Sequence, residues 1–574
     1  MRRLLVGIDL GTTNTTCSVA DSLPDGTAGQ ITPLHILQFL HPPGAQNCFG
    51  PHDVLPSVVG LGSDGTVYTG LRAKTAAPEL LSQHFRIVRD IKRQLGNPSW
   101  QVLLANRTLR PRHISALLLA TVKRSLDAAY PDAVIEKLVL TTPASFSSMM
   151  RQETLAAADI AGFDPRTIDL LDEPVAALLS SLIQTPSALR PTWSGKPVLV
   201  FDMGGGTLDA SIISISDTSR TVEILATSRY HEFAGNDIDL ELAALLLQRI
   251  RASHDYDGFL EIHPPVGTAS PALQIGLGLL SVGEQVKLNL SQLLQNGPQV
   301  GGIQNKLNHF RSSPTFVVAD LTLDFNVQPN PATVSLSALD LVEQLAPYMS
   351  PQGHQDRDIF VPVQQVLDRA NIRLPVDIFL AGAASYFPLV RDALASYFGQ
   401  TPHMLDPIYA VSHGAVLWAA MKQSETWHIT ETLRDSIFLK RRGHTFLEVL
   451  THPAPIPSNI HVKVLDPEES PYFSQAAGRI RLEFFQGEAP QDPLLSLCHI
   501  EDLHLNRALG DDARLTHLAA KVDANKVFHF DLTFEDRAGA LSASVSFASG
   551  GQRFFRPDNG SNPLKNLTLN GTSL

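Results

Sequence analysis

Apolar and polar positions follow two different periodicities along the chain, and the change between them predicts two kinds of domain. Apolar runs at residues 4–8 and 198–201 have the length and composition of buried strands, whereas residues 114–129 place apolar side chains on one side of a helix. After Met421 the pattern changes, and residues 528–535 alternate apolar and polar with a period of two. We therefore expect an α/β region followed by an antiparallel β-sandwich.

Two of the predicted strands end in the same order of residues, which indicates an internal duplication. The motif residues are Asp9, Gly11, Thr12 and Thr13 after the first strand, and Asp202, Gly204, Gly205, Gly206, Thr207 and Asp209 after the second. Consecutive glycines let backbone N–H groups crowd around an anion, and a carboxylate at a strand tip suits a hydrated Mg²⁺. Either motif alone could be a tight hairpin turn. Together they predict two hairpins that hold one polyphosphate.

These motifs resemble the two phosphate motifs of the seventy-kilodalton heat-shock chaperones (DnaK type), which belong to the actin and sugar-kinase ATPase superfamily. Later stretches resemble further landmarks of that family, in the family's order: 91–96, 143–152, 171–177, 233–239, 284–291, 377–388, 410–415, 481–488 and 521–527. The resemblance covers nearly the whole chain. It implies a two-lobed, actin-like (ribonuclease H-like) α/β ATPase domain followed by an all-β sandwich that binds extended apolar peptides.

The expected boundaries follow the same comparison. The ATPase domain spans residues 1–424, with lobe I at about 1–195, lobe II at about 196–395 and a closing helix at about 406–424. A linker occupies 425–435, the sandwich 436–550 and a disordered tail 551–574. The linker is less apolar than the Leu-rich linker of the family, which predicts weaker coupling between the domains. The short tail predicts that the helical lid of typical members is absent.

The resemblance also implies roles for individual residues. Asp9, Glu173 and Asp202 would hold waters of Mg²⁺, Lys74 would orient the attacking water, and Thr207 would lie near the γ-phosphate, with Asp209 supporting the water network. Pro143 and Arg151 would relay the nucleotide state to the sandwich. The nucleotide would contact Gly11, Thr12, Thr13, Gly204, Gly205, Gly206, Gly235, Glu284, Lys287, Ser291, Gly382, Ala383 and Tyr386. Taken without the family's register, Lys74 would be a solvated surface residue, and the spacing of Glu284, Lys287 and Ser291 would equally suit a solvated helix face.

Three positions depart from the family pattern at the expected base pocket. Leu288 and Tyr386 stand where the family usually has two arginines that enclose adenine, and Ala383 replaces a glycine. Dispersion and a π-face can still hold a base, but without guanidinium stacking. Nucleotide affinity or base selectivity is therefore expected to differ.

Composition narrows the classes of partner. A chain of 574 residues is long enough for two to four domains, and its net charge of -12 argues against nucleic acid and anionic membranes. Three widely spaced cysteines form no metal-ligand pattern and fit a reducing compartment. No apolar run approaches the roughly 20 residues of a membrane span. We expect a cytoplasmic monomer.

The expected function is ATP hydrolysis that regulates the binding of apolar, unfolded peptide segments, with fast exchange in the absence of a lid. The cofactors would be ATP/ADP and Mg²⁺, with K⁺ as a further candidate. A J-domain co-chaperone and a nucleotide-exchange factor would be the protein partners. An alternative is a weakly hydrolysing ATP sensor or scaffold whose sandwich docks one specific protein. A sugar or metabolite kinase, against which the sandwich argues, and a filament-forming actin-like protein are two further alternatives.

Overall fold

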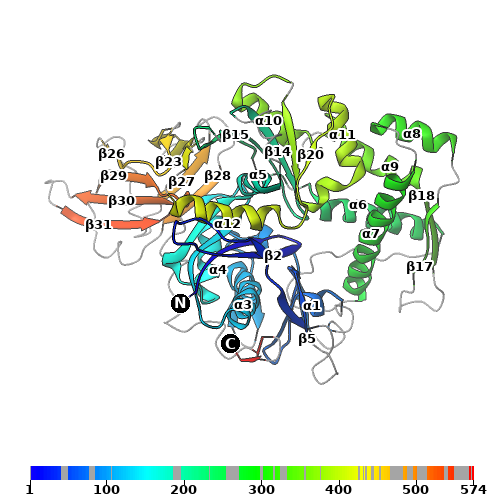
Figure 1. Cartoon of the computed structure of the whole chain (residues 1–574), viewed down its shortest axis with the longest axis horizontal. Helices are drawn as coiled ribbons and strands as arrows, with labels where there is room; N and C mark the ends of the chain where they lie inside the picture. Colours follow the sequence, from blue (N-terminus) through cyan, green and yellow to red (C-terminus); the bar gives the residue numbers. More distant parts are fainter. Residues whose placement is uncertain are drawn as a thin grey trace.

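The computed structural model (Figure 1) describes most of the chain. The described residues are 2–39, 49–75, 80, 85–104, 107–184, 195–216, 218–229, 231, 233–253, 271–297, 301–313, 317–323, 332–354, 357–374, 376–424, 427–430, 432–433, 436–440, 445–451, 454–465, 482–487, 495–500, 514–535, 541–548, 568–569 and 572–573.

Lobe I is built on a mixed sheet in which the N-terminal strand is central. The strands in order are β13 (Ile168–Asp172), β12 (Ala133–Thr142), β1 (Arg2–Leu10), β2 (Asn14–Asp21) and β3 (Thr32–Pro33), with β6 (Val54–Pro56) paired to β2. β1 pairs in parallel with β12 and antiparallel with β2. One face of this sheet packs on α3 (Pro111–Ala129) and α4 (Ser148–Ile160). A strand buried on both faces explains why β1 is an almost continuous apolar run.

A smaller part of lobe I continues from this sheet. Its elements are β4 (Ile36–Phe39), β5 (Phe49–His52), β7 (Val59–Leu61), β8 (Thr66–Thr69), α1 (Leu71–Thr75), β9 (Arg86–Val88), η1 (Ile91–Gln94), β10 (Val102–Leu104) and β11 (Arg107–Leu109). A one-turn 3₁₀ helix, η2 (Pro165–Thr167), precedes β13. β7 lies between β8 and β9 in an antiparallel arrangement.

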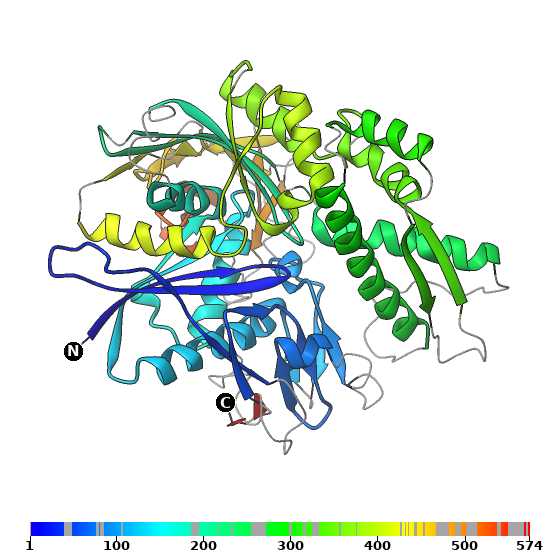
Figure 2. The ribbon, with the colours of Figure 1, turned by 45° about the vertical axis from the view of Figure 1, so that its right-hand side comes forward.

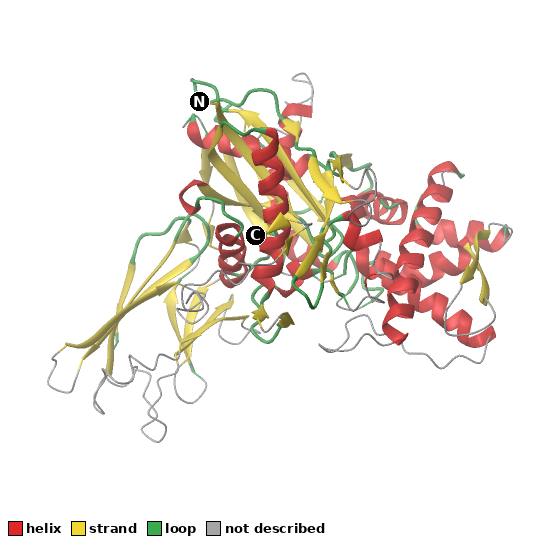
Figure 3. Ribbon diagram, turned by 90° about the horizontal axis from the view of Figure 1, so that it is seen from below, coloured by secondary structure: helices red, strands yellow, loops and turns green. Residues whose placement is uncertain are grey.

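Lobe II repeats the plan of lobe I. Its sheet contains, in order, β20 (His403–Met404), β19 (Asp377–Ala381), β14 (Pro197–Met203), β15 (Leu208–Ser216), β16 (Thr221–Thr227) and β21 (His428–Thr430). The remaining elements are α6 (Gly235–Ser253), α7 (Pro271–Asn296), α8 (Ile303–Ser312), β17 (Val317–Leu323), β18 (Ala332–Ser337), α9 (Ala338–Leu345), η4 (Ala346–Met349), α10 (Val361–Ala370), η5 (Ala383–Tyr386) and α11 (Pro388–Phe398). In Figure 3 one group of helices lies at the end of the molecule opposite the strands of the C-terminal domain, and Figure 1 shows that this group contains α6, α7, α8 and α9.

Two helices, α5 (Glu173–Gln184) and α12 (Ala410–Gln423), lie between the two large sheets (Figure 2). One core joins these helices to both sheets. The approach is close because glycines remove side chains at the crossings. A Cβ at Gly414 would lie 1.7 Å from the carbonyl oxygen of Ala176, and one at Gly7 would lie 2.3 Å from that of Ser412. The closing helix therefore packs on α5 and β1 of lobe I by backbone contact.

The C-terminal domain packs two antiparallel sheets face to face. One sheet has the order β24 (Phe446–Leu450), β23 (Ser436–Lys440), β27 (Leu482–Gly487) and β28 (Leu495–Ile500); the other has β26 (His461–Val464), β29 (Arg514–Val522), β30 (Phe528–Glu535) and β31 (Leu541–Ala548). Phe484 and Phe530 meet between the sheets with ring centroids 4.3 Å apart. The period-two pattern of residues 528–535 buries every second side chain, as predicted.

The predicted fold class is confirmed: an actin-like, two-lobed α/β region precedes a β-sandwich. The segment expected to be the linker contributes β21 to the lobe II sheet, in parallel with β16, while β22 (Thr432–Leu433) pairs with β25 (Ala454–Pro455). The expectation of a disordered tail needs a correction. β32 (Thr568–Leu569) and β33 (Thr572–Ser573) pair with each other, and β32 adds to β8. Residues 551–567 lie outside the described residues.

Candidate functional site: two glycine hairpins around buried carboxylates

The two predicted phosphate hairpins face each other across the lobes. Gly205 and Gly206 lie between β14 and β15 and approach the turn between β1 and β2. A Cβ at Gly205 would lie 1.7 Å from the Thr13 hydroxyl oxygen, and one at Gly206 would lie 2.2 Å from the Thr12 methyl carbon. No side chain fits at either position, so the glycines are required by the close approach. The structure thus brings together the two motifs that the sequence places about 190 residues apart.

Four carboxylates gather behind these hairpins. Asp9 lies near the end of β1, Asp202 near the end of β14, and Glu173 begins α5, while Asp209 is the register partner of Asp202. Glu173, Asp202 and Asp209 are buried, and Asp9 is half-buried. Burial, followed by the charge of Glu173, raises the pKa of Asp9 to about 7 and that of Asp202 well above its ordinary value. Burial also raises the pKa of Asp209 to about 7, although the Ser145 N–H donates to it at 3.3 Å.

Lys92 of η1 places its ammonium group among these carboxylates. Its Nζ lies 2.5 Å from the Glu173 Oε1, and its side chain is 4% exposed. Burial alone would lower the pKa of Lys92, but the charges of Glu173 and Asp9 raise it, so it stays protonated. A buried cation is therefore held where excess negative charge accumulates.

The catalytic role of Lys74 stays a prediction. Lys74 lies on α1 and lines the cavity described below, and its Nζ is 3.0 Å from the Oε1 of Glu284 on α7. Lys92 is the lysine whose ammonium lies among the carboxylates. The signal for Lys92 was present in the sequence, because the apolar residues Ile91 and Leu95 flank it and both are buried. A lysine between two core residues is a better candidate for a buried charge than one on a partly exposed helix.

A cavity of about 440 Å³ leads from the hairpins to lobe II. Its lining includes the predicted residues Thr12, Thr13, Gly205, Gly235, Glu284, Lys287, Ser291, Ala383 and Tyr386. Leu288, 53% exposed, and Tyr386 give one end of the cavity an apolar surface. Burial raises the pKa of Tyr386 to about 12, so its phenol stays neutral.

Contacts within the turns around the cavity hold the remaining predicted residues in place. The Lys287 ammonium lies 2.7 Å from the Asp239 Oδ1 and donates to the Gly235 carbonyl oxygen at 3.2 Å. Gly382 has φ +73°, and a Cβ there would lie 2.5 Å from Asp202 Oδ1. The turn before η5 is therefore pressed against the carboxylate cluster. In the hairpin, the Gly204 N–H donates to the Thr207 carbonyl oxygen at 3.0 Å.

Contacts across the cleft join the lobes at its rim. The Arg93 guanidinium donates to the Gly206 carbonyl oxygen at 2.6 Å and to Asp237 at 2.5 Å. The Asn236 amide donates to Asp90 at 2.6 Å and accepts from the Thr13 hydroxyl at 3.0 Å. Sequence reasoning predicted Thr13 and Gly206 as site residues but missed these contacts, since the partners lie more than 100 positions apart.

No group of three or more described His, Cys, Asp or Glu residues is placed to ligate a metal ion directly. The carboxylates nevertheless fit a hydrated cation, because Asp9, Glu173, Asp202 and Asp209 gather beside the single ammonium of Lys92, and burial together with the charge of Glu173 raises the pKa of Asp9, Asp202 and Asp209. Mg²⁺ commonly keeps several waters and binds through few carboxylates together with substrate phosphates. Asp9, Glu173 and Asp202 are the residues that would hold those waters.

The predicted relay residue Arg151 is completely surrounded by acceptors. Its guanidinium donates to the carbonyl oxygens of Pro143, Ala144 and Phe146, to the Thr142 hydroxyl, and to Asp172 at 2.9 Å. Asp172 directly precedes Glu173 of the carboxylate cluster. Arg151 therefore fixes the loop after β12 to the strand that carries the cluster.

The sandwich docks on the same aspartate. Lys526, in the turn between β29 and β30, places its Nζ 2.5 Å from Asp172 Oδ2, and the Asn525 side chain accepts from the Leu170 N–H at 2.9 Å. Burial raises the pKa of Asp172, but Lys526 and Arg151 outweigh it and hold the pKa below its ordinary value. The three-residue unit of Lys526, Asp172 and Arg151 links the β-sandwich to the residue next to Glu173.

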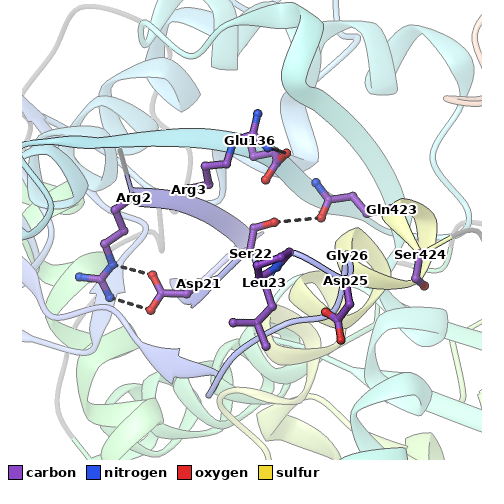
Figure 4. Close-up of a pocket in the computed structure, with 11 residues that line it drawn as sticks. Arg2, Arg3, Asp21, Ser22, Leu23, Asp25, Gly26, Glu136, Gln423 and Ser424 are labelled. Atoms are coloured by element: carbon purple, nitrogen blue, oxygen red, sulfur yellow. Dashed lines mark hydrogen bonds and ion pairs between the residues drawn. The ribbon is translucent and has the colours of Figure 1, made fainter.

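A second cavity, of about 1050 Å³, lies where β1, the β2–β3 loop and the end of α12 meet (Figure 4). Its charged groups bond to each other: Arg2 binds Asp21 through two nitrogens at 2.5 and 3.2 Å, and Arg3 lies 2.9 Å from Glu136. The Ser22 hydroxyl donates to Gln423 at 3.2 Å, which ties the loop to the closing helix. This polar hollow joins structural elements and offers little unpaired charge to a ligand.

Among the described residues, no helix is long and apolar enough to cross a membrane.

Comparison with known proteins agrees with this architecture. Residues 72–264 match the family model described as Hsp70 protein. The chaperone protein DnaK of Thermosipho melanesiensis is 26% identical over 502 residues, which cover 85% of this chain and 71% of that protein. The chaperone protein DnaK of Thermotoga neapolitana is 28% identical over 426 residues, 73% of this chain and 60% of that protein, and that of Thermosipho africanus is 28% identical over 428 residues, 74% and 60%. The matches thus span only 60% of the length of two of these three relatives. In its two-lobed fold, facing glycine hairpins and C-terminal sandwich, the chain is similar to members of the Hsp70 family.

Proposed function

We propose that the chain binds ATP or ADP with Mg²⁺ between its lobes and hydrolyses ATP. The observation that carries this proposal is the buried carboxylate cluster behind two glycine hairpins, with a cavity that opens toward α7. Asp9, Glu173 and Asp202 would hold the waters of the ion, and the hairpin N–H groups would hold the phosphates. Bound Mg²⁺ supplies charge neutralisation for the polyphosphate.

Lys92 is the residue that we assign to the transferring phosphoryl group. Its ammonium is fixed by Glu173 at 2.5 Å and is buried, so it needs little reorganisation to stabilise charge that develops on the γ-phosphate. Lys92 would orient the attacking water in the same position. Asp209 and Thr207 of the second hairpin, both buried, would provide further polar groups beside the γ-phosphate.

The sandwich would bind extended apolar segments of unfolded proteins, and nucleotide would regulate that binding. The contact that supports regulation is the Lys526–Asp172–Arg151 unit, because Asp172 is covalently adjacent to Glu173. A shift of Glu173 on nucleotide exchange moves Asp172, which changes the docking of the sandwich. A J-domain co-chaperone and a nucleotide-exchange factor are the regulatory partners that this cycle would use.

Three measurements test the proposal on the full-length protein. Calorimetry with ATP and ADP at saturating Mg²⁺ should detect tight binding that is lost when Mg²⁺ is removed. Steady-state phosphate release should rise when a permanently unfolded protein is added, and a fluorescent apolar peptide should bind more weakly with ATP than with ADP. The absence of nucleotide binding would overturn the whole proposal. ATP binding with no effect of unfolded protein would overturn the chaperone part.

The alternative of an ATP-binding sensor or scaffold is supported by the base end of the cavity. Leu288 and Tyr386 offer an apolar surface there, at the two positions where the family usually has arginines. A slowly hydrolysing protein that binds one folded partner tightly, and ignores many unrelated unfolded peptides, would establish this alternative.

A further inference from the structure

The C-terminal strands extend a sheet that lies almost the whole chain away in sequence. β32 pairs in parallel with β8, with Thr568 opposite Thr66 and Leu569 opposite Val67, and β33 pairs antiparallel with β32. The resulting sheet has the order β33-β32-β8-β7-β9. Without β32, β8 would be an edge strand with one row of unpaired backbone groups.

Only two residue pairs form between β32 and β8. Each ordinary backbone hydrogen bond contributes a small net stability, and strands this short are marginal on their own. The pairing is therefore weak enough to open and close while the rest of lobe I stays folded.

The strand that pairs with β32 is β8, and β8 leads into α1, which carries the ion pair between Lys74 and Glu284 across the cleft. The Thr69 hydroxyl, at the end of β8, lies 2.9 Å from the Thr121 hydroxyl of α3, and both side chains are buried. Gly70 follows with φ +73° and leads into α1, where Lys74 reaches Glu284 on α7 at 3.0 Å. Six residues thus separate Val67, where the pairing with β32 ends, from Lys74, whose ammonium bridges the lobes.

Hydrogen bonds hold the turn between β8 and α1, so that a movement of β8 would also move α1. The Leu71 N–H donates to the side-chain oxygen of Gln38 at 3.0 Å, and Gln38 in turn donates to the Val54 carbonyl oxygen at 2.8 Å. A Cβ at Gly70 would lie 2.3 Å from that same Gln38 oxygen. The start of α1 is therefore clamped, and a displacement of β8 carries the helix with it.

We propose that the outer edge of β8 is a docking site for the chain's own C-terminal strand, and that docking braces α1 so that the Lys74–Glu284 bridge keeps the cleft closed. The bracing half rests on the proposed nucleotide binding, whereas the docking half does not. Release of β32 would loosen α1 and speed the departure of bound nucleotide.

The test compares the full chain with a chain that ends at residue 566 and with two single variants. Leu569→Pro removes a backbone N–H and fixes φ, which opposes strand pairing, while Leu569→Ala keeps the backbone and serves as the matched control. Hydrogen exchange of the amides at residues 66–69 reports docking, and release of a fluorescent ADP analogue reports bracing. We expect both rates to rise about fivefold in the truncated chain and in Leu569→Pro, the factor that about one net hydrogen bond supplies, and to stay unchanged in Leu569→Ala.

Each outcome decides part of the proposal. Unchanged amide exchange in the truncated chain would overturn docking, and faster exchange with unchanged release of the analogue would overturn bracing. Protection of residues 66–69 that grows with protein concentration would show that the strand comes from a second copy, which also overturns the proposal. Failure of the wild-type protein to bind nucleotide would refute the proposed function and, with it, the bracing, while amide exchange would still decide the docking.

Discussion

Replacement of Lys92 tests whether its buried ammonium stabilises both the carboxylate cluster and the transition state of ATP hydrolysis. Lys92→Met keeps the length of the side chain and removes its charge, so Glu173 loses a partner 2.5 Å away in a place where both side chains are less than 10% exposed. Truncation of one member of a buried ion pair usually destabilises a protein by about 3–5 kcal/mol. Removal of one preorganised electrostatic group from a transition state slows the reaction by about 10²–10³-fold.

We therefore expect two separable effects of Lys92→Met. Single-turnover phosphate release from bound ATP should slow by about 10²–10³-fold. The thermal transition of the ATPase region should fall in the absence of Mg²⁺ and ATP and recover partly when both are added, since the ion restores positive charge beside the carboxylates.

Lys74→Met is the matched control, because Lys74 is about one-third exposed and pairs with an exposed glutamate. It should leave the rate of the chemical step within a few-fold of wild type, as exposed pairs contribute about 0.2–1 kcal/mol. The reasoning is refuted if Lys92→Met hydrolyses ATP at the wild-type rate while Lys74→Met loses the chemical step.

Three other predictions follow from single contacts. Gly205→Ala should weaken nucleotide binding at least tenfold by calorimetry, because its Cβ would lie 1.7 Å from a threonine oxygen of the facing hairpin, whereas Gly204→Ala, whose nearest atom is 3.8 Å away, should bind normally. Lys526→Ala should shrink the difference in peptide affinity between ATP and ADP by about tenfold, the value of a charge-assisted bond to buried Asp172, while Lys526→Arg should retain most of it; an unchanged difference would remove this contact from the coupling. Burial lowers the pKa of His113 to about 3, so below pH 6.5 the unfolded chain binds a proton that the folded chain does not. The free energy of unfolding should therefore fall by about 1.4 kcal/mol per pH unit from pH 6.5 toward pH 3. A His113→Gln variant that keeps the same slope in acid melting curves would contradict this.

The succession of residues within short segments was enough to predict the parts of the site that each come from one segment. Asp9 and Asp202 end strands that precede glycine turns, and the duplication implied that the turns meet, as they do. The period of two at residues 528–535 likewise predicted a half-buried strand. These features depend on neighbours in the chain, which a sequence displays directly.

Features that depend on distant partners were missed. Lys74 and Lys92 both lie in the stretch after the first hairpin, and only the fold shows which one turns inward. Lys526 and Asp172 are separated by 354 positions, so their pairing leaves no local pattern. The pairing of β32 with β8 involves two residues on each side, too few for a periodic signal.

The glycine crossings of α12 fix its distance from two elements of lobe I. With only backbone between Gly414 and Ala176 of α5, and between Gly7 of β1 and Ser412, no compressible side chain can absorb a change of spacing. The two helices and the central strand therefore move as one rigid unit, and any larger side chain at Gly7 or Gly414 would force their backbones apart.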